Sequence, residues 1–139
     1  MRQWGHILPE YTIESYTRFL STHYRRGGAP TMFVALRGGK AAGTAALDDE
    51  DMATHPELKP WLASVYTDEK YRGQGLGKML VQRVIQEARQ AGEKKLYLYT
   101  HDRQRFYERY GWKTLFEEEY HGEIQSVMAL DISPHIPSR

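Results

Sequence analysis

The sequence of 139 residues contains no cysteine. Disulfide bonds, thiolate nucleophiles and zinc sites built on cysteine are therefore excluded. It also lacks any apolar run of about 18 residues, the length that a transmembrane helix needs. Charge is nearly balanced, since 19 Lys and Arg face 18 Asp and Glu and leave a net charge of +1. We therefore expect a cytoplasmic protein that binds neither nucleic acid nor a membrane.

The composition is that of a folded domain. Hydrophobic residues make up 40% of the chain and charged residues 27%, which argues against intrinsic disorder. The length fits one domain, and the sequence shows no internal repeat. We expect a single domain over residues 1–139.

Hydrophobic periodicity predicts a helix at the start of the chain. Ile13, Tyr16 and Leu20 recur at three- and four-residue spacing within residues 9–26, which would place them on one face of a helix. Gly27 and Gly28 follow as a stop signal.

The rest of the chain alternates between strand and helix signals. Apolar runs around a Gly-Gly turn over residues 31–47 predict a β-hairpin. Apolar residues at helical spacing predict a helix that starts at Leu76 and stops at Gly92. The other predicted elements are strands at 61–67, 95–100, 112–116 and 124–132, and a short helix at 101–110. The layout is mixed α/β, and its central strand–helix–strand unit should bring two strands parallel.

Residues 71–78 carry the strongest functional signal. Gly73, Gly75 and Gly77 stand between a predicted strand and a predicted helix, where unhindered backbone N–H groups meet the positive end of the helix dipole. Arg72 and Lys78 add two positive charges. The segment therefore predicts a phosphate or pyrophosphate cradle.

Two common phosphate loops do not match this segment. A P-loop would need glycine at Arg72 and serine or threonine at Met79. A dinucleotide-binding loop would need the spacing Gly-x-Gly-x-x-Gly, whereas here the glycines alternate with single residues. A glycine-rich turn that only joins strand to helix remains the alternative.

Two motifs resemble those of the GNAT N-acetyltransferase superfamily. Arg72-x-x-Gly75-x-Gly77 resembles its acetyl-CoA pyrophosphate loop, and the segment from Phe106 to Trp112, with Tyr107 in it, resembles its second signature. The resemblance implies an α/β (α+β) fold. Its central sheet would be mixed and mostly antiparallel, with roughly six or seven strands, about four flanking helices, and parallel strands that splay apart at the cofactor site.

The resemblance also implies acetyl-CoA as cosubstrate and the positions that hold it. In the family the pantetheine arm pairs with the strand before the loop, and the pyrophosphate rests on the loop amides. The end of the following strand often carries an asparagine that touches the cofactor, and Thr100 stands there instead. The implied cofactor-binding residues are Val65, Tyr66, Thr67, Arg72, Gly73, Gln74, Gly75, Leu76, Gly77, Lys78 and Thr100.

The implied reaction is acetyl transfer to a primary amine of a small molecule or peptide, by direct attack in a ternary complex. A backbone N–H near Val65 would hold the developing oxyanion. The family's general acid falls on Tyr107. A phenol with a pKa of about 10 stays protonated at pH 7 and can donate to a leaving thiolate of pKa about 8.5.

The general base and the acceptor site are less defined. The family's base position falls near Trp61, which cannot titrate. The substitutes are Asp48, Asp49, Asp51 and His55 in the loop that leads to this strand, of which His55 and Asp51 are the candidates taken forward. Acidic residues at 48–51 would attract a cationic amine if they border the acceptor cleft, or they form a solvated loop. The candidate substrate-binding residues are Asp48, Asp49, Trp61 and Tyr24. No histidine pair has metal-ligand spacing, and we expect no metal.

Two functions compete with an acyltransferase. One is a non-catalytic module that senses acyl-CoA, and the other is a non-catalytic adaptor, of which the nucleic-acid-binding form is disfavoured by the balanced charge. The expected partners are acetyl-CoA and an amine acceptor. The chain would act as a monomer or a homodimer.

Overall fold

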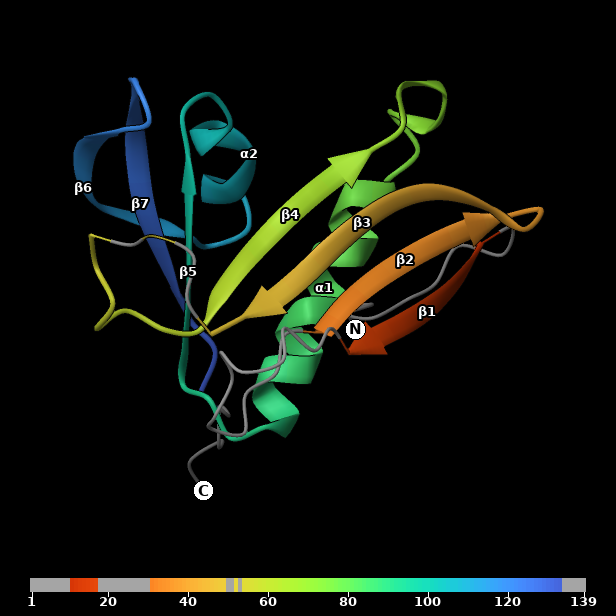
Figure 1. Ribbon diagram of the computed structural model, residues 1–139, viewed down its shortest axis with the longest axis horizontal. Coiled ribbons are helices and arrows are strands. Elements are labelled where there is room, and N and C mark those ends of the chain that lie inside the picture. Colours follow the sequence, from red (N-terminus) through yellow and green to blue (C-terminus); the bar gives the residue numbers. More distant parts are fainter. Residues whose placement is uncertain (1–10, 18–30, 50–51, 53, 134–139) are drawn as a thin grey trace.

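The computed structural model describes residues 11–17, 31–49, 52 and 54–133. Seven strands form one mixed sheet in the order β1-β2-β3-β4-β5-β7-β6 (Figure 1). Every neighbouring pair is antiparallel except β4 and β5, which are parallel. The elements are β1 Thr12–Thr17, β2 Thr31–Arg37, β3 Lys40–Asp48, β4 Trp61–Thr67, α1 Leu76–Gln90, β5 Lys95–Thr100, α2 Gln104–Glu108, β6 Lys113–Tyr120 and β7 Glu123–Asp131. The predicted mixed, mostly antiparallel sheet is confirmed.

The predicted first helix is wrong where the structure describes it. Residues 12–17 form strand β1, which pairs antiparallel with β2 from Thr12–Leu36 to Thr17–Thr31. This segment is rich in Thr, Ile and Tyr, which favour strands, and β2 provides the backbone partners that periodicity alone cannot reveal. The remainder of the predicted helix, residues 9–10 and 18–26, lies outside the described residues.

The helices are fewer than the resemblance implied. The described residues hold two α-helices and a 3-10 turn at Glu69–Tyr71, against the expected four or so. Helix α2 is shorter than predicted, and β6 runs four residues past the predicted end at Phe116. Within the described part of the chain, no helix is long and apolar enough to cross a membrane.

Two tight hairpins build the outer parts of the sheet. Gly38 and Gly39 join β2 to β3 with φ of 59° and 80°, and His121 and Gly122 join β6 to β7 with φ of 54° and 84°. Two central residues with positive φ define the turn whose twist matches that of the strands. The Gly-Gly hairpin predicted over residues 31–47 is thereby confirmed.

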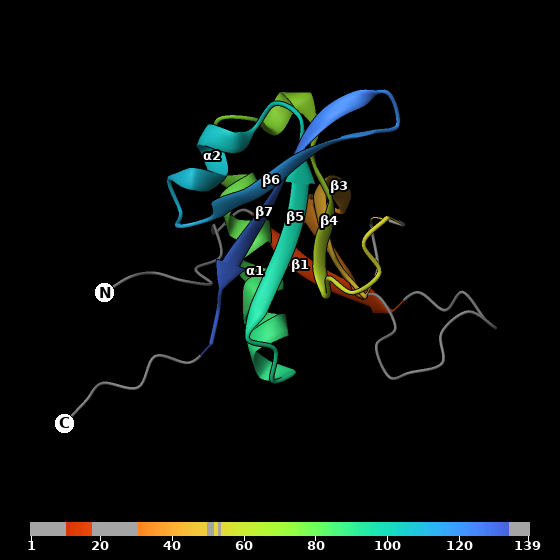
Figure 2. The same ribbon diagram turned by 90° about the vertical axis from the view of Figure 1, so that its left-hand side faces the viewer.

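The sheet separates two apolar clusters. On one face, Leu96 and Leu98 of β5 join the main core with Leu80 and Val84 of α1. On the other face, the alternating residues of β5 belong to a second cluster around Trp61. Figure 2 shows α1 and α2 on one side of β5 and the loop that precedes β4 on the other.

A glycine brings the sheet close to α1. A Cβ on Gly43 of β3 would lie 2.7 Å from the Tyr66 carbonyl oxygen and 3.0 Å from Leu80 Cδ1. No larger residue fits there without a shift of backbone, so Gly43 fixes the distance between β3, β4 and α1.

Candidate active site

The site begins where β4 and β5 separate. Their parallel pairing rests on Trp61 opposite Tyr97, and the Tyr97 N–H donates to the Pro60 carbonyl at 3.0 Å. Past that point the described strands diverge, β4 following β3 and β5 following β7 (Figure 1). The expected splayed strands are confirmed. The divergence leaves the second half of β4 with a free edge toward β5, which an extended ligand can use as if it were a strand.

A bulge shapes this free half of β4. The register with β3 shifts by one residue between Thr44 and Ala46, and Ser64 takes a left-handed conformation with φ of 54°. The Thr44 hydroxyl donates to the Ser64 carbonyl at 2.7 Å and holds the bulge. The side chains of Val65 and Tyr66 beyond it are 36% and 56% exposed. A bulge of this kind redirects the strand, and such strained positions gather at functional sites.

The glycine-rich loop connects β4 to α1. Its first residues form the 3-10 turn, whose N-terminal end is capped by Asp68 accepting from the Lys70 N–H at 3.0 Å. Gly73 and Gly75 then take φ of 82° and 84°, a region that other residues reach only at a cost. Gly75 is also the N-cap of α1 and has no side chain to bond the first helical amides. These amides are therefore available to an anion at the positive helix end.

Tyr107 reaches the site from α2. Its ring packs edge-on against Trp112 and Phe106, with centroids 5.7 and 5.1 Å away, and the residue is 8% exposed. In the described part of the chain its hydroxyl has no hydrogen-bond partner. Burial raises the pKa of Tyr107 above its ordinary value of 10, although the charge of Arg103 opposes the rise. The phenol is therefore a neutral donor at pH 7.

These pieces surround one groove of about 400 Å³. Its walls come from the free half of β4, the glycine loop with the start of α1, and the segment around α2. Arg72, Lys78 and Arg103 give it positive charge. The predicted residues that line it are Val65, Tyr66, Thr67, Arg72, Gly73, Gly75, Leu76, Gly77, Lys78 and Tyr107. Tyr71, Phe106 and Tyr110 also line it and were not predicted as site residues.

Two predicted cofactor residues do not line this groove. Gln74 turns its side-chain carbonyl to the hydroxyl of Tyr11, which donates to it at 2.7 Å. The Thr100 hydroxyl accepts the N–H groups of Asp102 and Arg103 at 3.4 and 3.1 Å and so shapes the turn before α2.

The predicted acceptor residues that the structure describes, Trp61, Asp48 and Asp49, do not line this groove. Trp61 is fully buried in the second cluster, where its Nε1 donates to the Leu58 carbonyl at 2.6 Å. Asp48 ends β3, and Asp49 follows it, both partly buried. Tyr24 and Asp51 fall outside the described residues.

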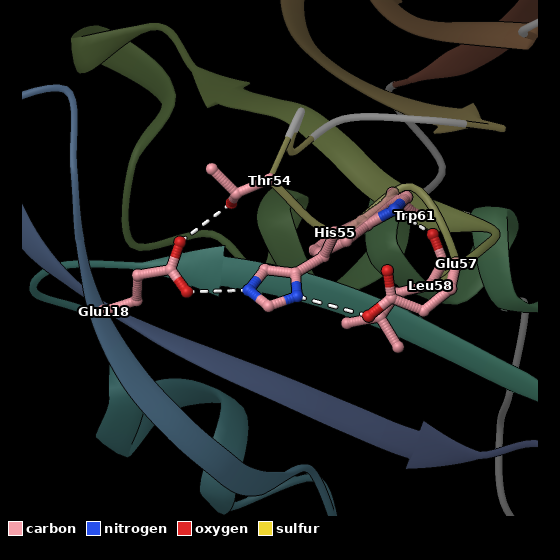
Figure 3. Close-up of polar contacts among 6 residues, drawn as sticks. All are labelled: Thr54, His55, Glu57, Leu58, Trp61 and Glu118. Atoms are coloured by element: carbon pink, nitrogen blue, oxygen red, sulfur yellow. Dashed lines mark hydrogen bonds and ion pairs between the residues drawn. The ribbon is translucent and has the colours of Figure 1, made fainter.

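His55 lies on the face of the sheet opposite α1, in a polar cluster (Figure 3). Its Nε2 lies 2.6 Å from Glu118 Oε1 and its Nδ1 lies 3.2 Å from Glu57 Oε2. The hydrogen bond with Glu118, opposed by partial burial and helped by Glu57, raises the pKa of His55 above 6.5. Two carboxylates favour the protonated ring, whereas a general base must be neutral. Its partner Glu118 is 63 residues away in the chain, so no local motif pointed to it.

Comparison with known proteins fixes the family. The sequence model described as the Acetyltransferase (GNAT) family matches residues 1–112. The chain belongs to this family. No curated protein matches the sequence.

In the described residues, no group of three or more His, Asp or Glu side chains could hold a metal ion.

Solved GNAT structures share the fold of this chain. A GNAT family acetyltransferase from Elizabethkingia anophelis, with acetyl-CoA bound, is similar at a TM-score of 0.65 and 14% identity, over 89% of this chain and 99% of that one. An acyl-CoA N-acyltransferase from Pseudomonas aeruginosa is similar at a TM-score of 0.61 and 25% identity, over 74% of this chain and 69% of that one. ElaA from Escherichia coli is similar at a TM-score of 0.61 and 19% identity, over 75% of this chain and 70% of that one.

Proposed function

We propose that this GNAT acetyltransferase moves the acetyl group of acetyl-CoA to a primary amine of a small molecule or peptide. The observation that carries the proposal is one groove that joins the free edge of β4, the start of α1, which has no side-chain cap, and Tyr107, whose hydroxyl has no partner among the described residues. Each of these three features suits one part of an acyl-CoA: the pantetheine arm, the pyrophosphate and the thioester sulfur.

The residues of the groove fit such a cosubstrate. The amides from Gly73 to Lys78 and the positive end of α1 would hold the pyrophosphate, with the charges of Arg72 and Lys78 beside it. The backbone of Val65, Tyr66 and Thr67 would pair with the pantetheine amides. A peptide N–H in this stretch would also hydrogen-bond the oxygen that becomes negative as the amine attacks. Acetyl-CoA itself supplies an acetyl thioester.

Tyr107 would complete the reaction as general acid. As the amine nitrogen bonds to the acetyl carbon and the C–S bond breaks, the sulfur would take the electron pair and the Tyr107 hydroxyl would donate its proton to it. The nitrogen would release one proton to solvent as the amide forms, and the Tyr107 phenolate would take a proton back from solvent. Burial keeps the Tyr107 phenol protonated, as this role requires. The amine must arrive neutral. As its base, Asp51 and His55 stay predictions, of which His55 is engaged by two carboxylates.

The same groove also suits a sensor that binds acyl-CoA without turnover. Calorimetry with acetyl-CoA, followed by free-thiol release from the same samples with a panel of primary amines, separates the two functions. Binding together with amine-dependent release is the expected result. Binding without release by any amine would favour the sensor. Absence of binding would refute both and leave residues 71–78 as a connecting turn.

The remaining proposals concern the setting of the activity. We propose a single domain over residues 1–139 that acts in the cytoplasm as a monomer or homodimer, without nucleic acid or membrane as partner. The near-balanced charge supports the last point.

A further inference from the structure

A buried tyrosine that does not line the groove contacts the glycine loop. Tyr11 immediately precedes β1 and is 2% exposed, and its hydroxyl donates to Gln74 Oε1 at 2.7 Å. Its ring meets that of Tyr71, at the start of the loop, edge-on at 6.2 Å. The guanidinium of Arg37, at the end of β2, lies 5.8 Å from the centroid of each ring. Two segments distant in sequence thus converge on the loop.

Gln74 sits at the point of the loop that most needs support. It lies between Gly73 and Gly75, whose φ angles are both in the left-handed region. Glycine has the largest conformational freedom of any residue, so this stretch loses the most entropy when it becomes ordered. Gly73 and Gly75 line the groove, whereas the Gln74 side chain bonds Tyr11 instead.

Two other hydrogen bonds flank residues 73–75, the tip of the loop, in the described part of the chain. Before it, Arg72 Nε donates to the Thr67 carbonyl at 3.3 Å, and after it the Gly75 carbonyl accepts the Met79 N–H at 3.0 Å. Among the described residues, the Tyr11 hydroxyl is the partner that the structure gives to the Gln74 side chain.

We propose that Tyr11 is a positioning residue: through Gln74 it holds the Gly73–Gly75 arch in the shape that binds the acetyl-CoA pyrophosphate. This inference rests on the proposed function for its ligand. A loop already ordered in the free protein loses less entropy on binding, and the affinity rises accordingly. Tyr11 does not line the groove, so it acts on binding and leaves the chemical step unchanged.

Tyr11→Phe tests the proposal because it keeps the ring and its contacts with Tyr71 and removes only the hydroxyl. The loss of one neutral hydrogen bond should raise the Kd for acetyl-CoA about threefold to tenfold, with kcat at saturating acetyl-CoA and the KM for the amine unchanged. Amide hydrogen exchange at residues 71–77 of the free protein should become faster. Tyr97→Phe, in the second cluster on the other face, is the matched control. It should change neither the Kd for acetyl-CoA nor the exchange at residues 71–77.

Gln74→Ala completes a double-mutant cycle with Tyr11→Phe. If the two residues act through one bond, the double variant binds acetyl-CoA no more weakly than Gln74→Ala alone. Additive effects would overturn the proposal, as would unchanged exchange at residues 71–77 in Tyr11→Phe. The exchange readout needs no ligand. If the wild-type protein fails to bind acetyl-CoA, the proposed function falls, whereas faster exchange in Tyr11→Phe still establishes the positioning.

Discussion

The two faces of the sheet at the splayed strands differ in how far the described residues hydrogen-bond their polar groups. On the α1 and α2 face, the groove leaves three features unused by the described residues: the Tyr107 hydroxyl, the first amides of α1 and the free edge of β4. On the other face, His55 and Trp61 are bonded within the fold, to Glu118 and to the Leu58 carbonyl (Figure 3). Buried polar groups normally find partners inside the protein. The face that leaves them open is the one that the proposed ligand, acetyl-CoA, would complete.

The difference extends to charge. Arg72, Lys78 and Arg103 give the groove a positive wall, and the structure brings no carboxylate among its lining residues. Opposite them, His55 is held between two carboxylates, which neutralise it within the cluster. One face therefore suits an anionic ligand, while the other is tied together by its own ion pairs.

The largest effect should come from Tyr107→Phe. Removal of the proposed general acid should lower kcat for thiol release by on the order of a hundredfold to a thousandfold, because the leaving thiolate would lose its proton donor. The Kd for acetyl-CoA should change little, since the ring and its packing remain. Steady-state assays at saturating acetyl-CoA, with calorimetry on the same samples, measure both quantities.

Tyr110→Phe is the matched control for this change. Tyr110 lines the same groove, close to α2, and has no assigned proton to give. Equal losses of kcat in the two variants, or a full rate in Tyr107→Phe at every pH, would contradict the assignment of the acid.

Gly75→Asp should have the next largest effect. The carboxylate would enter the start of α1, where the pyrophosphate would lie, at a position with φ of 84°. Charge repulsion and backbone strain together should raise the Kd for acetyl-CoA by about a hundredfold or more. Calorimetric titration measures the change.

The opposite end of α1 supplies the control. Gly92 has a comparable φ of 87°, and a Cβ there meets nothing within 4 Å, as at Gly75. Gly92→Asp therefore imposes the same backbone demand away from the groove, and its affinity should match that of the wild type. If the two variants bind alike, the loop does not hold the pyrophosphate.

The sequence predicted the features that depend on neighbouring residues. The glycine loop could be recognised because its glycines, which permit positive φ, and the flanking charges of Arg72 and Lys78 all lie within residues 72–78. The segment around Tyr107 is equally local. The Gly-Gly hairpin followed from its turn residues, and α1 from 15 residues of consistent periodicity.

Features that depend on distant contacts could not be predicted. The six residues of β1 fit a helical spacing as well as a strand, and their pairing with β2 decided between them. The bonds from Tyr11 to Gln74 and from His55 to Glu118 each span 63 residues. Thr100 had the hydroxyl that a ligand contact needs, but the N–H groups of the following turn use it.

The smallest effect should be the pH dependence of the His55 cluster. The pKa of His55 is raised above 6.5 by its bond to Glu118, so its contribution to stability is complete below about pH 6.5 and disappears as the pH rises through the raised value. The pKa of Glu118 is lowered from 4.5 mainly by the same bond, so its contribution is lost when the pH falls through that lowered value. The cluster should therefore stabilise the fold most at about pH 5–6.

His55→Gln measures this contribution. The wild type should melt a few degrees higher than the variant at about pH 5.5, and the gap should narrow toward pH 9 as His55 of the wild type loses its proton. Thermal unfolding followed by circular dichroism across this range gives the difference, with His101→Gln, a more exposed histidine, as the control. Acetyl-CoA affinity at pH 7 should be the same in both proteins, because His55 lies across the sheet from the groove. A large loss of acetyl-CoA affinity in His55→Gln would show that the His55 cluster belongs to the cofactor site, and it would contradict the separation of the two faces.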